Sequence, residues 1–282
     1  MVSDICDLHY GVGMSTATRA TDGPTLHDVV GDVDFLAGAP RRFLMEIAVQ
    51  PVGHGVADHS RALRDPVGRF RNTTAYIYLV AFGTPEEREA VIRMVNRAHR
   101  PVRSGPGAEV EYSAFDPESQ LWVAGCMYYG GRDMWQRMFG PMDDAAADRL
   151  YRQFQIYGTS LQVPPELWPE DRAAYDDYVA RTLESITIDR RVRDYGAQLL
   201  DPSGRPLPVR PVFRLMRFIT IGLLPEQLRA AYEFPWSPAD QRRFDRLMRL
   251  GASGHRVMPR RLRELPKDLL LRSSRRAVAA NA

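Results

Sequence analysis

The chain has 282 residues, of which 44% are hydrophobic and 10% aromatic, so it can bury one large core or two modest ones. Its 38 lysines and arginines against 35 aspartates and glutamates leave a formal charge of +3, which is too small to gather nucleic acid over the whole surface. The two cysteines, Cys6 and Cys126, argue against a disulfide framework and fit a reducing compartment. No apolar run approaches the roughly 18 residues that a membrane span requires, so we expect a cytoplasmic protein.

The order of helical patterns favours one domain. They follow one another from about residue 31 to about residue 250 without a long polar linker, and the weak linker candidate is the proline-rich stretch 201–211. We expect residues 1–30 to form an N-terminal arm and residues 31–265 to form a single helical domain. Residues 266–282 are basic, and we expect them to form a flexible C-terminal tail.

The first clear pattern begins at Pro40, where apolar residues recur at three- and four-residue steps up to a break at Pro51. The segment 65–82 follows and is rich in β-branched and aromatic residues, so local propensity permits a strand there. It is much longer than an ordinary strand. Its length therefore favours a second helix.

The next helix has the strongest start signal, because Thr84 suits the N-cap and Pro85 suits the first helical position. It should run to about His99 and stop near Pro101. Apolar residues along it recur at i, i+3, i+4 and i+7, with arginines on the opposite face. This spacing places His99 on the inward face.

Later helix starts are marked by acidic, serine or proline residues that suit a first helical turn. Helices are expected to begin near Asp116, Asp143, Pro225 and Ser237 and to cover residues 170–183 and 189–200. No segment between residues 41 and 250 alternates as a half-buried strand does, and the chain has no internal repeat. The predicted fold is all-α, a single globular multi-helix domain.

The sequence lacks the motifs that several kinds of chemistry require. There is no close pair of histidines or cysteines at zinc spacing, no glycine-rich phosphate loop, no Walker lysine and no Gly-x-Ser-x-Gly elbow. What remains is the inward His99, together with Arg69 and Thr73 one helical turn apart. On the residues alone, a satisfied core histidine and a solvated Arg–Thr pair are the commoner interpretations of these features.

A resemblance to a known family favours a functional role for these residues instead. From about residue 41 to about residue 266 the sequence resembles the family of helical oxygenases that includes the bacterial latex-clearing rubber oxygenases and the fungal oxygenase of mycophenolic acid biosynthesis. The segments that carry the resemblance, in the family's order, are RRFLMEIAVQPVGHGVADHS, DPVGRFRNTTAYIYLVAFGTPEE, VNRAHRPVRSG, YSAFDPESQLWV, VPPELWP, LLPEQLRAAYEFPWSPADQRRF and MPRRLRELP.

The resemblance implies a haem b group held in a pocket among the helices. Its iron would be bound by the histidine of a His-x-x-x-Arg motif, here His99, with Arg103 pairing a propionate or a neighbouring acid. On the far side of the haem, the family's Arg-x-x-Lys-Thr motif corresponds to Arg69, Asn72 and Thr73. Because Asn72 replaces a lysine that can coordinate iron, an open sixth position that suits O₂ or peroxide is expected.

Two departures from the family pattern leave alternatives open. Many bacterial relatives carry histidines where this chain has Gln50 and Ala124, so the chemistry of this branch differs if either histidine supports the haem. His54, about one turn beyond Gln50, and Cys126 are alternative iron ligands. His59 also matches the family and is either a pocket residue or a core or capping residue.

The leading hypothesis is therefore a haem b-dependent oxygenase or oxidase that acts with O₂ or peroxide on a small hydrophobic metabolite. The alternative is a haem-free enzyme or binding protein that uses the same scaffold for a non-redox reaction. A third hypothesis, an interaction module using the basic C-terminal tail, rests on charge alone. A homodimer is compatible with the sequence, whereas the substrate and the electron source are not specified by it.

Overall fold

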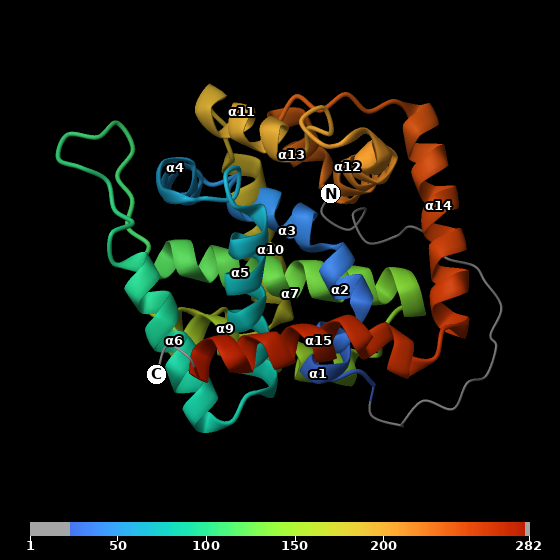
Figure 1. The fold of residues 1–282 in the computed structure, drawn as a ribbon, viewed down its shortest axis with the longest axis horizontal. Helices are drawn as coiled ribbons and strands as arrows, with labels where there is room; N and C mark the ends of the chain where they lie inside the picture. Colours follow the sequence, from blue (N-terminus) through green and yellow to red (C-terminus); the bar gives the residue numbers. More distant parts are fainter. Residues whose placement is uncertain (1–22, 280–282) are drawn as a thin grey trace.

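The computed structural model of the chain describes residues 23–279, and every regular element in that range is helical (Figure 1). The all-α prediction is confirmed. The elements are α1 (Leu26–Gly31), α2 (Val33–Ala37), α3 (Ala39–Glu46), α4 (Gln50–His59), α5 (Pro66–Phe82), α6 (Pro85–His99), α7 (Pro117–Phe139), α8 (Asp144–Phe154), α9 (Ile156–Thr159), the 3₁₀ turn η2 (Pro165–Leu167), α10 (Arg172–Ser185), α11 (Arg190–Leu199), η3 (Leu207–Val209), α12 (Arg210–Leu223), α13 (Glu226–Ala231), α14 (Pro238–Val257) and α15 (Arg260–Ala279).

Helix α7 runs through the middle of the molecule, with α2, α3 and α14 packed along it (Figure 1). Its buried face includes Trp122, whose indole Nε1 donates a 2.9 Å hydrogen bond to the backbone oxygen of Met45 in α3. One hydrophobic core joins side chains from Leu26 in α1 to Val278 in α15. Burial of this shared apolar surface is what holds the helices in one body.

The predicted helix starts are confirmed. Thr84, Asp116, Asp143 and Ser237 each occupy an N-cap, where the side-chain oxygen accepts a hydrogen bond from a backbone N–H of the first turn. At Thr84 the cap is reciprocal, because the Glu87 side chain accepts from the Thr84 backbone in return. Caps satisfy backbone donors that the helix leaves free, so these local signals fix where each helix begins.

Segment 65–82, whose local propensity permits a strand, forms the continuous helix α5. Its second half is buried in the core, through Thr74, Ala75, Ile77, Tyr78, Leu79, Val80 and Ala81. Helices α6 and α15 both pack against α5. Packing on several sides, rather than helix propensity, therefore decides its conformation.

The expectation of a flexible C-terminal tail is wrong for residues 266–279, which form most of α15. Leu271, Ser274 and Val278 recur at three- and four-residue steps on one face and are buried. In Figure 1, α15 lies along the lower edge of the molecule and crosses α5. Arg272, Arg275 and Arg276, which suggested a solvated tail, are exposed on this helix.

The expected N-terminal arm is also partly wrong. Residues 26–30 belong to α1, where Leu26, Val29 and Val30 are buried in the core. Residues 1–22, including Cys6, lie outside the described range. Within the described range, no helix combines the length and apolar content needed to cross a bilayer.

Candidate functional site

Three side chains from separate helices define the candidate site: Glu46 at the end of α3, Arg69 in α5 and His99 at the end of α6. His99 is the last residue of α6 because Pro101 follows and disfavours further helical turns. Its side chain is half-buried, and its ring lies edge-on to Phe115 with the centroids 6.4 Å apart. The buried Nδ1 atom of His99 has no hydrogen-bond partner.

Hydrogen bonds fix the end of α6 against α7. The Gln120 side chain of α7 donates to Gln162 Oε1 at 2.5 Å and accepts from the Gln162 backbone at 2.8 Å. Gln162 in turn donates to Asn96 Oδ1 at 3.1 Å. Because Asn96 lies one turn before His99, this amide network holds the last turn of α6, which carries His99.

Among the residues predicted from the sequence, Arg69 is the one whose charge affects the pKa of His99. Its guanidinium carbon lies 5.8 Å from the centre of the Phe43 ring of α3, while the side chain is largely exposed. Burial lowers the pKa of His99, and the positive charge of Arg69 lowers it further. Both causes favour the neutral imidazole, which is the form that can bind a metal.

Glu46 is the site residue that sequence reasoning missed. Burial raises the pKa of its carboxyl to about 7, although the charges of Arg42 and Arg69 oppose that rise. The side chain makes no hydrogen bond or ion pair with another described residue. One signal was available, since Glu46 is a single acid within the apolar segment 43–49, and acids in such surroundings have perturbed pKa values.

Cys126 of α7 lies near enough to Glu46 for the negative charge of Glu46 to affect its thiol. Burial and that negative charge raise the pKa of the thiol well above its ordinary value. The side chain is almost fully buried. A protonated, buried thiol does not supply the thiolate that haem iron requires, which weighs against Cys126 as an alternative ligand.

The remaining predicted residues lie at the surface around this cluster. Asn72 and Thr73 are exposed on α5, in the same half as Arg69. Arg103 is exposed on the loop after α6, where its backbone pairs with Ser113. Since α6 ends at His99, Arg103 is not one helical turn farther along the same helix, and its side chain has no hydrogen bond or ion pair with another described residue.

The other histidines considered from the sequence are occupied by structural partners. His54 Nε2 pairs with the Asp189 carboxylate and so ties α4 to α11. His59 Nε2 lies 3.2 Å from the Tyr112 hydroxyl, which itself donates to Asp58. Among these candidates, His99 therefore has the ring nitrogen that is buried and unpartnered.

These residues fit an axial iron ligand with an apolar group beside it. The imidazole is favoured in its neutral form, Nδ1 is unpartnered, and the end of α6 is held in place. Apolar side chains near Arg69 and His99 are uncovered: Val67 is 68% exposed, Phe70 42% and Phe115 37%. A flat apolar cofactor would bury surface that is otherwise left to water.

Comparisons with known proteins identify the family of the chain. The family model described as ER-bound oxygenase mpaB/B'/Rubber oxygenase, catalytic domain, matches residues 27–252. Uncharacterized protein Mb2261 of Mycobacterium bovis is 38% identical over 225 residues, which cover 77% of this chain and 88% of that protein. Uncharacterized protein Rv2237 of Mycobacterium tuberculosis matches with the same figures.

No solved structure matches the chain significantly. The matched residues 27–252 include Glu46, Arg69 and His99, and they end shortly before α15 begins. Family membership supports an oxygenase, and hence an oxidoreductase, as the class of activity. The chain belongs to the family of ER-bound oxygenase mpaB/B' and rubber oxygenase catalytic domains.

Proposed function

We propose that this protein is a haem b-dependent oxygenase or oxidase that acts with O₂ or peroxide on a small hydrophobic substrate, with His99 as the axial iron ligand. The observation that carries the proposal is the His99 imidazole, whose Nδ1 is buried without a partner at the end of an anchored helix. A neutral imidazole has one ring nitrogen with a lone pair, and that nitrogen can bind a metal.

The cofactor would supply the oxidising chemistry, and the chain would hold it. His99 would bind the iron, while Arg69 and Arg103, both at the surface, would pair with its propionates. Burial and then the charge of Arg69 lower the pKa of the imidazole, which favours its neutral form. The uncovered Phe70 and Phe115 would lie against the apolar parts of the cofactor or the substrate.

Proton handling is assigned to Glu46. A carboxyl whose pKa is about 7 exchanges its proton readily near neutral pH, so it can give a proton to the reacting substrate or take one from it. Thr73 can donate a hydrogen bond from its hydroxyl, and Asn72 from its side-chain amide. We assign both to orienting the oxygen substrate on the exposed half of α5.

The hydrophobic class of substrate follows from the surroundings of the site. Three of the uncovered side chains near Arg69 and His99, namely Val67, Phe70 and Phe115, are apolar. A substrate that covers them gains free energy by burying its own apolar surface. A small apolar molecule is therefore the ligand that these surroundings favour.

The proposal is tested by purifying the untagged chain from cells supplied with a haem precursor and measuring its visible spectrum and its ratio of haem to chain. We expect a Soret band at a ratio approaching one, and oxygen consumption in the presence of an apolar substrate. A colourless protein that takes up no added haem would overturn the proposal. It would favour the haem-free alternative on the same scaffold.

A further inference from the structure

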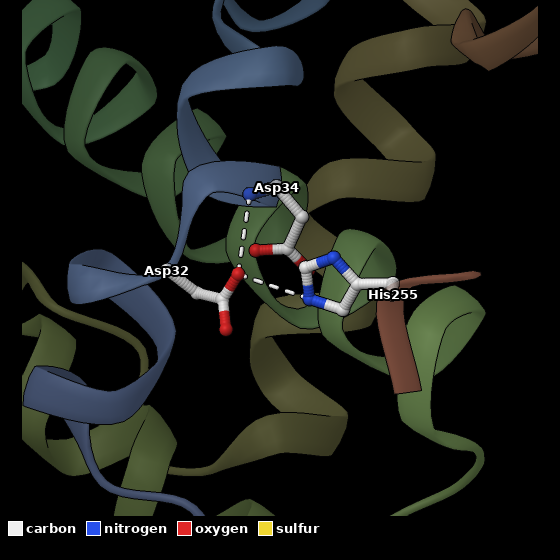
Figure 2. Close-up of side chains that lie close together, drawn as sticks. All are labelled: Asp32, Asp34 and His255. Atoms are coloured by element: carbon white, nitrogen blue, oxygen red, sulfur yellow. Dashed lines mark hydrogen bonds and ion pairs between the residues drawn. The ribbon is translucent and has the colours of Figure 1, made fainter. Parts of the chain in front are cut away.

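A second cluster of titratable side chains lies far from His99, where the start of α2 meets the end of α14. Figure 2 shows its members, Asp32 at the N-cap of α2, Asp34 in the first turn of α2 and His255 in the last turn of α14. Figure 1 places α14 and α6 on opposite sides of the molecule. The three residues are only 3%, 5% and 7% exposed, so the cluster is closed to solvent.

Two polar atoms in this cluster are buried without a hydrogen bond. Asp34 Oδ2 has no partner, and neither does His255 Nε2. Nε2 lies 3.0 Å from Asp32 Oδ1, yet the two groups are not aligned as a hydrogen bond requires. In Figure 2 the Asp34 carboxylate and the imidazole both point toward the space beside Asp32. Unsatisfied buried atoms are costly, so their convergence calls for an explanation.

The spacing of these atoms fits ligands around one ion. One nitrogen or oxygen from each residue lies within 4.8 Å of the others. Carboxylate and imidazole ligands sit about 2.0–2.2 Å from a transition metal, which places any two of them about 3–4.4 Å apart. The 3.0 Å approach of Asp32 Oδ1 to His255 Nε2 lies within that range.

The charged groups of the cluster do not balance, and one further positive charge would neutralise them. Arg263 of α15 pairs with Asp32 through Oδ2, which orients that carboxylate and leaves Oδ1 facing the other two residues. With a neutral imidazole, two carboxylates and one guanidinium carry a net charge of −1. The neighbouring cations Arg260 and Lys267 are engaged elsewhere, with Asp28 and Glu264 among their partners.

Both carboxylates and the imidazole are buried, so an additional positive group beside them would be favourable. That group is either a cation or a proton. The convergence of ligand atoms favours a cation, since a proton on His255 would be expected to lie along an aligned hydrogen bond, and Nε2 forms none.

We propose that Asp32, Asp34 and His255 bind one divalent transition-metal cation of the Zn²⁺ or Mn²⁺ class. Two carboxylates and an imidazole suit such ions, whereas Ca²⁺ and Mg²⁺ prefer sites built from oxygen. The cation joins α2 to α14, and through Arg263 it also joins α15 to them. Its role is structural. His255 and Arg263 lie outside residues 27–252 matched by the family model, so the site does not depend on the proposed oxygenase function.

The test uses the full untagged chain, stripped with a chelator and titrated with Zn²⁺ or Mn²⁺. We expect binding of about one equivalent, and a rise in Tm of roughly 5–10 °C when the metal is about 100-fold above its Kd. Asp34→Asn and His255→Gln should lose both effects. Asp28→Asn and His27→Gln, which change an acid and a histidine outside the cluster, should keep them. His99→Ala should bind the metal as the wild type does.

Measurements on the metal-free proteins distinguish a bound cation from a bound proton. They also distinguish loss of metal binding from a folding defect. Asp34→Asn removes a buried charge, so without metal its Tm should equal or exceed that of the wild type, which shows that the variant folds. A wild-type chain that binds neither Zn²⁺ nor Mn²⁺ at one equivalent would overturn the proposal. Equal binding by the wild type and by both cluster variants would overturn it as well.

Discussion

The two halves of helix α5 differ in almost everything except their backbone. Residues 74–81 are buried, apart from the partly covered Tyr76, whereas Val67, Arg69, Phe70, Asn72 and Thr73 in the first half are all exposed. The same regular helix thus serves both as core and as a support for an open surface. The buried half fixes the direction of the exposed half, so the side chains assigned to the site stand on a rigid element.

Contacts of the buried half show how it is held. The Tyr76 hydroxyl donates a 2.6 Å hydrogen bond to the backbone oxygen of Tyr157, and the Tyr157 hydroxyl donates to the Ile77 backbone oxygen at 3.0 Å. Tyr78 is fully buried. The exposed half contacts α3 through Arg69 and the Phe43 ring but makes no such hydrogen bonds to other described helices, so changes in the two halves should affect different properties of the protein.

The largest effect on stability is expected in the buried half, at Tyr78. Tyr78→Ala leaves a cavity and should lower the free energy of unfolding by about 3–5 kcal/mol. Tyr78→Phe is the matched control, because the buried hydroxyl has no hydrogen-bond partner and its removal should not lower stability. Chemical denaturation measures both. Equal destabilisation by the two variants would show that the hydroxyl, rather than packing, matters.

In the exposed half, Thr73→Val should alter activity and leave stability unchanged. The side chain is exposed, so the free energy of unfolding should stay within about 0.5 kcal/mol of wild type. If the hydroxyl orients the oxygen substrate, turnover should fall about 10²- to 10³-fold with haem content retained. Substrate-dependent oxygen consumption is the measurement. Full turnover would remove Thr73 from the site.

Glu46, which interacts with Arg69 of the exposed half, should make stability depend on pH. Its pKa in the folded protein is about 7, above its ordinary value of 4.5, so the folded state holds the proton more tightly than the unfolded state does. Stability from this group is therefore fully present below pH 4.5 and is lost as the pH rises to 7, by up to about 3 kcal/mol.

Glu46→Gln removes that dependence. Relative to the wild type, the variant should gain stability between pH 5 and pH 8, as measured by denaturation at each pH. A difference that stays constant over this range would mean that the carboxyl titrates normally. The neutral glutamine keeps the size of the side chain, so packing is little changed.

Arg69→Ala should also have little effect on stability, because an exposed arginine contributes little. It should nevertheless raise the pKa values of both His99 and Glu46, since the positive charge of Arg69 lowers both. Titration of the His99 ring by NMR in the haem-free chain measures the first change. An unchanged His99 pKa would mean that the exposed half of α5 does not reach the site.

How much the sequence predicts depends on whether a signal is local. The start of α6 follows from the cap at Thr84, because a cap involves only the next few residues. Helix α15 was not predicted, because the Leu271–Val278 stripe lies among arginines and becomes a core face only against α5. Glu46 was missed for a similar reason, since its surroundings come from three separate helices.

The central claim is that His99 holds a haem, and the ratio of haem to folded chain tests it directly. His99→Ala is compared with His54→Ala, which removes a histidine that is already paired with Asp189. We predict that His54→Ala keeps the wild-type ratio and Soret band, whereas His99→Ala loses most of its haem. A His99→Ala protein with wild-type haem content and an unchanged spectrum would contradict the claim.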